Sequence, residues 1–341
     1  MIESLVDWSQ KYYSNLPWRK KRSLYSTLVS EIMLQQTTVS TVINHFERFI
    51  QKYPSITDLA KATEEQILMD WKGLGYYRRA RNLLNAAKEI QENFSGDIPL
   101  NYGDLVSIKG IGAYTANAII GIGADQRALC LDANLERVIS RLYALKTHKG
   151  PRLQKEIYQK FMEYKICEDI DKVGPRKFNE ALMDLGRSVC KAKNAHCHLC
   201  PLRENCLARL NSNPLFFPNT QEQKKTQQHE LFLLRVVVQK ANKILVYQKH
   251  SKEWLSGQYE LPSFNFYSTD LAINQYAKVR NDEAYLFLPQ FKTAITKYKI
   301  TNFVLYADEF DFDFLKNKRF EWKKLEDLNL STASLKALHL I

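Results

Sequence analysis

Residues 190–206, CKAKNAHCHLCPLRENC, place four cysteines close together, at Cys190, Cys197, Cys200 and Cys206. Six, two and five residues separate them in turn. Four thiolates in so short a span can close around one metal centre, and thiolate is a preferred ligand of both zinc and iron–sulfur clusters. A single Cys-x2-Cys pair would be weak evidence, whereas a four-point spacing is specific. The segment therefore predicts a metal-binding loop.

Size and charge narrow the class of protein. At 341 residues the chain exceeds one typical domain, so we expect at least two cores. A net charge of +12 suggests a polyanionic partner such as nucleic acid, although a merely basic soluble protein would also fit. No apolar run is long enough for a bilayer, so we expect no membrane contact.

The amino-terminal residues bear on the compartment. The sequence MIESLVDWSQKYY at residues 1–13 lacks the basic-then-apolar pattern of a signal peptide. We therefore expect a cytoplasmic protein in a reducing compartment. Clustered cysteines there are more often metal ligands or redox groups than disulfides.

The first two hundred residues have the pattern of helices. Apolar residues recur at helical spacing through residues 39–50. Thr63 and Gln66 form a capping box, and Pro151 and Pro175 occupy positions typical of a first helical turn. We assign residues 1–210 to one helical region.

The pattern changes after this region. Residues 211–229 are polar, carry two prolines and lack periodicity, which predicts a linker. Residues 231–239 are rich in branched apolar side chains, and a turn at residues 241–242 leads to residues 244–248, which predicts a hairpin. Residues 230–341 are therefore expected to form a separate α+β domain.

A glycine-rich turn joins two helical patterns at residues 108–116, IKGIGAYTA. Gly110 and Gly112 flank one apolar residue, which allows a tight turn and a close approach of another backbone. The free N–H groups of the following helix could hold a phosphate, and a resemblance described below extends this to a DNA phosphate at Lys109, Gly110 and Gly112. A plain turn between helices is the alternative that the motif alone leaves open.

Two acidic residues stand at positions that could carry chemistry. Asp132 opens the helix that carries Leu135 and Val138, where an aspartate most often serves only as a cap. Glu31 lies beside the apolar stripe of residues 24, 28 and 32, which places it at the edge of a core. For either residue taken alone, a structural or solvent-exposed role is the ordinary expectation.

Taken together, these segments resemble the endonuclease III and MutY family of DNA repair glycosylases. The cysteine spacing matches its iron–sulfur loop, and residues 108–116 resemble its helix-hairpin-helix. SEIMLQQT at residues 30–37 is close to a signature of MutY-type adenine DNA glycosylases, and LDAN at residues 131–134 resembles the MutY pattern LDGN, with Ala133 replacing glycine. LPWR at residues 16–19 and WKGLGYY at residues 71–77 also look like MutY stretches.

The resemblance covers about residues 4–210 and implies a fold. It predicts a helix-hairpin-helix glycosylase fold with a six-helix barrel over about residues 21–125. Residues 1–20 and 126–210 would form an iron–sulfur module, in which the four cysteines hold one 4Fe–4S cluster. Basic neighbours of this loop, Arg187, Lys191 and Lys193, would meet phosphates.

The resemblance also implies an activity. The chain would be a monomeric adenine DNA glycosylase of bacterial type, cytoplasmic with the nucleoid. It would excise adenine mispaired with 8-oxoguanine or guanine in double-stranded DNA. Glu31 would be the general acid, and Asp132 would stabilise the oxocarbenium ion. Tyr114 and Asn134 would orient this second half of the site.

Further residues receive roles through the resemblance. Tyr114 stands where endonuclease III enzymes carry a lysine, and a tyrosine cannot form the imine of a lyase. Packing or salt-bridge roles remain open for the DNA-contacting residues. Trp18, Arg19 and Glu180 would line the adenine pocket, while Gln36 and Tyr76 would wedge into the duplex around the opposing base.

The resemblance thins in the carboxyl-terminal part. EWLSGQYELP at residues 253–262 is similar to a segment of the Nudix-related MutY domain that recognises 8-oxoguanine. Its reader loop often contains Phe-Ser-His, where this chain has Ile295-Thr296-Lys297. Thr296 keeps a hydroxyl, but the histidine is missing.

Two other classes remain as alternatives. One is an endonuclease III-like glycosylase and AP lyase that acts on oxidised pyrimidines, which Tyr114 opposes. The other is a non-enzymatic helix-hairpin-helix DNA-binding protein whose cysteines hold a structural zinc ion. That second class would leave the pairing of Glu31 with Asp132 unexplained.

Overall fold

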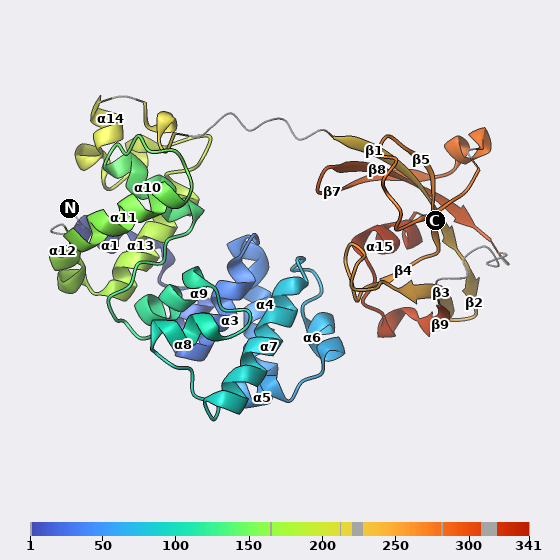
Figure 1. Ribbon diagram of the computed structural model, residues 1–341, viewed down its shortest axis with the longest axis horizontal. Helices are drawn as coiled ribbons and strands as arrows, with labels where there is room; N and C mark the ends of the chain where they lie inside the picture. Colours follow the sequence, from blue (N-terminus) through green and yellow to red (C-terminus); the bar gives the residue numbers. More distant parts are fainter. Residues whose placement is uncertain are drawn as a thin grey trace. The chain divides into compact units, whose positions relative to one another are not determined.

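The computed structural model describes residues 2–163, 166–211, 213–219, 228–280, 282–307 and 319–340. The chain forms two compact units, Met1–Gln223 and Lys224–Ile341 (Figure 1). The predicted linker, residues 211–229, spans the boundary between them, and residues 212 and 220–227 of that segment lie outside the described residues. Within the described ranges, no helix combines the length and the apolar character needed to cross a membrane.

The first unit is built from helices (Figure 1). The α-helices are α1 (Ile2–Tyr13), α2 (Pro17–Lys20), α3 (Leu24–Leu34), α4 (Val39–Lys52), α5 (Ile56–Ala60), α6 (Glu64–Asp70), α7 (Arg78–Asn93), α8 (Tyr102–Ser107), α9 (Ala113–Ala118), α10 (Ala133–Leu142), α11 (Pro151–Glu163), α12 (Ile166–Val173), α13 (Pro175–Ser188) and α14 (Leu207–Asn211). A π-helical turn, Ile119–Gly123, continues α9. The prediction of a mostly helical amino-terminal part is confirmed.

Local sequence signals set where several helices begin. Thr63 and Gln66 form the predicted capping box at the start of α6. Pro151 and Pro175 are the first residues of α11 and α13, as predicted from their missing N–H groups. Ser23 caps α3, the helix that carries Glu31, so this helix begins at a defined residue.

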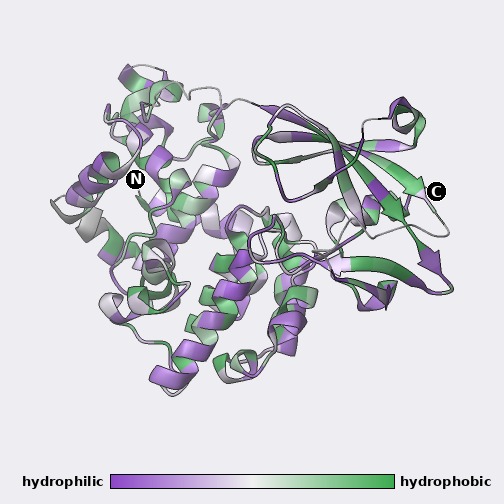
Figure 2. Ribbon diagram, turned by 45° about the vertical axis from the view of Figure 1, so that its right-hand side comes forward, coloured by the Kyte–Doolittle hydropathy of each residue, from purple (hydrophilic) through white to green (hydrophobic). Residues whose placement is uncertain are grey.

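Two hydrophobic cores stabilise the first unit. One is formed by buried side chains between Tyr25 and Ala128 and includes the buried Trp71 and Phe46. The other combines Ile2, Leu5 and Val6 of α1 with residues 129–202. The first core ends at Ala128, and the second takes up the chain at Leu129. Figure 2 shows hydrophilic and hydrophobic residues alternating around these helices, as amphipathic packing requires.

The second unit contains two β-sheets and a helix, α15 (Thr332–Leu338). One sheet has the strand order β6-β5-β1-β8-β7, and the other has the order β2-β3-β4 with β9 paired to β3. The strands are β1 (His229–Val237), β2 (Gln239–Lys240), β3 (Lys243–Gln248), β4 (Tyr259–Glu260), β5 (Ser263–Ser268), β6 (Ala277–Lys278), β7 (Gln290–Ile295), β8 (Tyr298–Tyr306) and β9 (Phe320–Lys324). Helix α15 packs against β1 and β7.

The predicted hairpin at residues 231–248 needs a correction. The turn at Ala241 and Asn242 joins β2 to β3, with Lys240 paired to Lys243. The long strand β1 instead pairs with β5 and β8 in the other sheet. Its nine-residue parallel register with β8 uses residues far away in the sequence. A local hairpin pattern cannot indicate such partners.

Candidate active site

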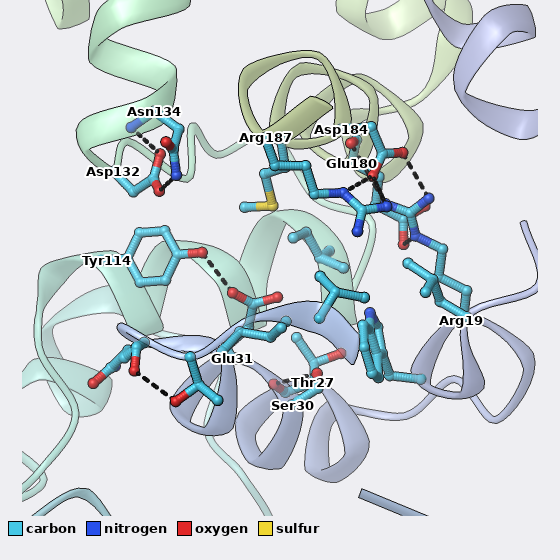
Figure 3. Close-up of a pocket in the computed structure, with 18 of the residues that line it drawn as sticks. Arg19, Thr27, Ser30, Glu31, Tyr114, Asp132, Asn134, Glu180, Asp184 and Arg187 are labelled. Carbon is cyan, nitrogen blue, oxygen red and sulfur yellow. Dashed lines mark hydrogen bonds and ion pairs between the residues drawn. The ribbon is translucent and has the colours of Figure 1, made fainter. Parts of the chain in front are cut away.

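A cavity of about 640 Å³ opens between the two cores of the first unit. Its walls come from the segments around α2, α3, α9, α10 and α13. Eight of the predicted site residues line it, namely Trp18, Arg19, Glu31, Gln36, Tyr114, Asp132, Asn134 and Glu180. Figure 3 shows Tyr114 and Asp132 on one side of Glu31, and the group of Arg19, Glu180, Asp184 and Arg187 on the other.

Glu31 lies in the middle of this cavity on α3, and only 5% of its surface is exposed. The Tyr114 hydroxyl donates a hydrogen bond of 2.5 Å to its Oε2 atom. Burial raises the pKa of Glu31 to about 7, against the lowering effect of this hydrogen bond. Asp132 and Glu180 raise it further, whereas Arg19 lowers it. A carboxyl group with this pKa is a proton donor near neutral pH.

Asp132 is the N-cap residue of α10. Its Oδ1 atom accepts hydrogen bonds from the backbone N–H groups of Asn134 and Leu135, at 2.9 and 2.8 Å. The Asn134 side-chain amide donates to its Oδ2 atom at 2.7 Å. The capping role that the sequence predicted is thus present, and it fixes the orientation of a carboxylate that lines the cavity.

Asn134 also connects this carboxylate to the cysteine loop. The Arg137 guanidinium donates to Asn134 Oδ1 at 3.0 Å and, through Nε, to the Cys190 carbonyl at 2.8 Å. Arg141, which is buried, donates to Cys190 Sγ at 3.3 Å. Neither arginine was assigned a role from the sequence, because the bonds to Cys190 join residues about fifty positions apart.

The opposite wall is a buried group of charges. Asp184 accepts hydrogen bonds from Ser9 at 2.5 Å and from Arg19 at 2.8 Å, and it forms an ion pair with Arg187 at 3.0 Å. Glu180 forms a bidentate pair with Arg22, at 2.6 and 3.1 Å, while Arg19 Nε lies 3.5 Å from its Oε1 atom.

This wall includes one basic neighbour of the cysteine loop and one acid that the sequence motifs did not indicate. Arg187 lines the cavity and pairs with Asp184, and its expected phosphate contact stays a prediction. Asp184 was missed, although its spacing of four residues from Glu180 places both acids on one face of α13.

Trp18 packs against the first core and also faces the cavity. Its ring meets the Phe46 ring edge-on, with centroids 5.6 Å apart, and it packs against the first core. It also lines the cavity. The indole is therefore a packed wall, which is the arrangement that a flat apolar ligand requires.

Gln36 and Tyr76 are exposed and carry unusual backbone angles. Gln36 follows α3 with φ of 57°, and Tyr76 precedes α7 with φ of 47°. For non-glycine residues this left-handed region costs about 1–2 kcal/mol each. Gln36 reaches the rim of the cavity, while Tyr76, with 59% of its surface exposed, is absent from the lining. Strain of this kind is typical of functional positions.

The predicted glycine-rich segment at residues 108–116 joins α8 to α9, with residues 108–112 as the turn and residues 113–116 inside α9. Gly110 has φ of +102°, and a Cβ atom there would lie 2.6 Å from the Asn82 carbonyl oxygen of α7. Gly112 is the N-cap residue of α9 and has open space around it. Lys109 is exposed, and its backbone N–H donates to Glu89 at 2.9 Å. Close helix packing is therefore the demonstrated reason for Gly110.

The four cysteines lie apart from this cavity. Cys190, Cys197, Cys200 and Cys206 line one small cavity of about 30 Å³, together with Arg141. In the part of the chain that the structure describes, no three His, Cys, Asp or Glu side chains are grouped closely enough to hold a single metal ion. The four thiols that line this cavity, with an arginine donor at Cys190, are of the ligand type that iron–sulfur centres use.

Thr296 belongs to the second unit, at the two-residue turn between β7 and β8. It has φ of 49°. The neighbouring Lys297 pairs with Asp270 at 2.9 Å, and Tyr298 donates to the same carboxylate at 2.5 Å. The loop predicted to read the oxidised base is thus a tight hairpin turn with one anchored lysine.

Comparison with known proteins gives consistent results. A model of the HhH-GPD superfamily of base excision DNA repair proteins matches residues 29–164. An adenine DNA glycosylase of Buchnera aphidicola subsp. Schizaphis graminum is 34% identical over 252 residues, which is 74% of this chain and 71% of that protein. Another, from Buchnera aphidicola subsp. Baizongia pistaciae, is 37% identical over 65% of this chain but only 62% of that protein.

Two further proteins match about 60% of this chain. The human adenine DNA glycosylase is 35% identical over 60% of this chain and 39% of that protein. The solved structure of a thermostable thymine-DNA glycosylase superposes with a TM-score of 0.51 and 26% identity, over 61% of this chain and 94% of that one. From these matches, the chain belongs to the family of MutY-type adenine DNA glycosylases within the HhH-GPD superfamily.

Proposed function

We propose that this protein is a monofunctional adenine DNA glycosylase that acts in base excision repair on adenine mispaired with 8-oxoguanine or guanine. One observation carries the proposal. A buried glutamate whose pKa is raised to about 7 and a helix-capping aspartate line the same cavity. Cutting a purine from its sugar creates negative charge on the base and positive charge on the sugar. One carboxyl group can protonate the base while the other stabilises the sugar cation.

Glu31 would be the general acid. As the glycosidic bond breaks, negative charge develops on the departing base, and a proton from Glu31 neutralises it. Burial raises the pKa of Glu31 to about 7, so a large fraction of the protein carries that proton near neutral pH. The hydroxyl of Tyr114 fixes the carboxyl through its 2.5 Å hydrogen bond. Tyr114 carries no amine, so it cannot form the imine that a lysine forms at this position in a lyase. This supports a glycosylase without a lyase step.

Asp132 would face the sugar as an anion. The oxocarbenium ion that forms there is stabilised by a nearby negative charge that is already oriented before reaction. Three hydrogen bonds, from Asn134 and from the backbone N–H of Leu135, supply that orientation. Asn134 thus acts on the reaction through Asp132.

The opposite wall would receive the base. Adenine must leave the stacked duplex before its leaving-group edge can be protonated. Trp18 offers an aromatic wall, and Arg19 and Glu180 offer hydrogen-bonding groups at the same cavity. The volume of about 640 Å³ is in the range of small-molecule pockets. Gln36 and Tyr76 would enter the duplex, as wedge side chains do in other DNA-distorting proteins.

The remaining parts would hold the DNA. Lys109, Gly110 and Gly112 would approach a phosphate at the turn before α9. The four cysteines would carry one 4Fe–4S cluster, which would shape the loop that bears Lys191 and Lys193. The second unit would be a Nudix-like domain that recognises 8-oxoguanine near Thr296, in a protein that acts as a monomer in the cytoplasm.

A single-turnover assay tests the proposal. Duplexes with adenine opposite 8-oxoguanine, guanine or thymine are compared, and we expect release of free adenine from the first two but not from the third. Glu31→Gln should slow release by about 10²–10⁴-fold while binding to the mismatched duplex persists. Release of a pyrimidine, or borohydride trapping of the chain on DNA, would instead point to the lyase class.

A further inference from the structure

Arg79 connects the two turns that present Gln36 and Tyr76. We propose that Arg79 is a positioning residue that sets these two side chains as one unit, so that both enter the duplex together when the adenine is extruded. The inference rests on the proposed function, because it assigns the control of a step in that reaction.

The contacts of Arg79 define this role. Its guanidinium is buried, with 7% of the residue's surface exposed. One terminal nitrogen, Nη1, donates to the carbonyls of Ile32 and Met33 at 2.9 and 2.7 Å. These carbonyls belong to the last turns of α3, just after Glu31 and shortly before Gln36.

The other terminal nitrogen reaches both turns. Arg79 Nη2 donates to Thr37 Oγ1 at 2.8 Å and to the carbonyls of Leu74 and Gly75, each at 3.1 Å. Thr37 is the residue after Gln36, and Gly75 is the residue before Tyr76. One planar group therefore binds the flanks of both proposed wedge residues.

Both turns need such support. The backbone angles at Gln35 (φ −58°, ψ 115°) and Gln36 (φ 57°) correspond to a type II turn, which favours glycine at the position that Gln36 occupies. Tyr76 follows Gly73 and Gly75, and all three residues have positive φ. Left-handed residues other than glycine persist only where the surroundings hold them.

A second set of contacts fixes the Tyr76 side chain. The Arg79 guanidinium lies 5.5 Å from the centroid of the Tyr76 ring and 5.6 Å from that of Trp71. Trp71 Nε1 also donates to the Gly75 carbonyl at 3.1 Å. Cation–π attraction at this distance orients an aromatic ring that is otherwise exposed. Through Arg79, the Tyr76 ring is therefore connected to the turn that carries Gln36.

Lysine cannot replace this arrangement. An ammonium group keeps the positive charge, but it lacks the planar fork that spans acceptors on two segments. The test is therefore Arg79→Lys in the full chain, compared with Gln36→Ala and Tyr76→Ala. The substrate is a duplex with adenine opposite 8-oxoguanine, and the measured quantities are the single-turnover rate of adenine release and the thermal midpoint.

We expect Arg79→Lys to release adenine slowly, with an effect that is not additive with those of Gln36→Ala and Tyr76→Ala. Loss of charge-assisted hydrogen bonds should lower the rate of release by about 10- to 100-fold. When Arg79→Lys is combined with Gln36→Ala or Tyr76→Ala, the double variant should be much less impaired than the product of the single effects, because both changes disable the same unit. Multiplicative effects would overturn the proposal, since they would mean that Arg79 acts only on general stability.

A fluorescence readout separates positioning from stability. With 2-aminopurine beside the mispair, wild type should give a fluorescence increase on binding as the stack opens. Arg79→Lys and Tyr76→Ala should each reduce that increase. Arg81→Lys serves as the matched control, because Arg81 lies on the same helix and pairs with Glu64 at 2.6 Å. An equal reduction in this control would contradict the inference.

A milder variant covers the case in which Arg79→Lys does not fold. Thr37→Val removes one acceptor of Arg79 and keeps the side-chain shape, so release should slow by about 3-fold, without further loss in a Gln36→Ala background. Independent effects of the two changes would again reject the inference. Failure of the proposed function looks different, because wild type itself would then release no adenine.

Discussion

Burial of the Glu31 carboxyl makes the free energy of unfolding depend on pH. Its pKa is about 7 in the folded chain, above the ordinary value of 4.5. Between these pH values the folded chain binds a proton that the unfolded chain has lost. The resulting stability is fully present below about pH 4.5 and is lost as the pH rises through 7.

Glu31→Gln should therefore stabilise the protein in a pH-dependent way. The amide cannot ionise, so the gain in free energy of unfolding over wild type should be larger at about pH 8 than at about pH 5, by about 2 kcal/mol. Urea denaturation at the two pH values measures this difference. The exposed Glu65→Gln is the charge-matched control. A gain that does not depend on pH would show that Glu31 is already ionised at pH 5.

At the residue level, motifs indicated the two acids and the residues that orient them, but not the charge pairs of the opposite wall. Glu31 and Asp132 stand in segments that have a recognisable pattern of neighbours. Asp184 and Arg22 do not, since the partner of Asp184, Arg19, is 165 positions away. Charge pairing over such separations depends on how the segment around α2 packs against α13, which local sequence does not encode.

At the scale of elements, the turn between α8 and α9 makes a direct prediction. Gly110→Ala places a methyl group 2.6 Å from the Asn82 carbonyl, at a φ of +102° that alanine disfavours. We expect a loss of about 2–4 kcal/mol in the free energy of unfolding, from strain and overpacking together. Chemical denaturation of the purified variant measures this loss.

Gly112 is the matched control for that substitution. Gly112→Ser adds a side chain into open space at an N-cap position, where serine is favoured. Its free energy of unfolding should stay within about 0.5 kcal/mol of wild type. Equal free energies of unfolding for Gly110→Ala and Gly112→Ser would contradict the conclusion that this turn packs closely on α7.

If the four cysteines hold a 4Fe–4S cluster, the purified protein should contain iron. Protein purified without oxygen should be brown and contain about four iron atoms per chain. Cys200→Ser should lower the iron content and weaken binding to duplex DNA, because the loop loses the centre that shapes it. Elemental analysis combined with visible absorption measures both effects. One zinc ion per chain in a colourless sample would contradict the cluster.

The helices were predicted well because their signals are local. Caps and first-turn prolines act within a few residues, as Thr63 and Pro175 illustrate. Strand pairing follows other rules. β1 pairs with β8 across some seventy residues, so the sequence pattern predicted strands but assigned β1 to the wrong neighbour.

At the scale of the whole molecule, the two units have separate cores. Removal of residues 228–341 should therefore leave a folded first unit that still releases adenine. Its preference for 8-oxoguanine over guanine opposite adenine should decrease, because the proposed reader is gone. Single-turnover rates on the two duplexes measure the preference. An unchanged ratio in the truncated protein would reject the reader role given to the second unit.

In the proposed reaction, two carboxyl groups in one cavity divide the charge of base excision, and Glu31 is protonated at the start. The pH dependence of kcat/KM for adenine release tests this, because it reports the ionisation of the free enzyme. We expect kcat/KM to fall tenfold per pH unit above about pH 7, where Glu31 loses its proton. A profile that is flat or rises with pH across this range would contradict it.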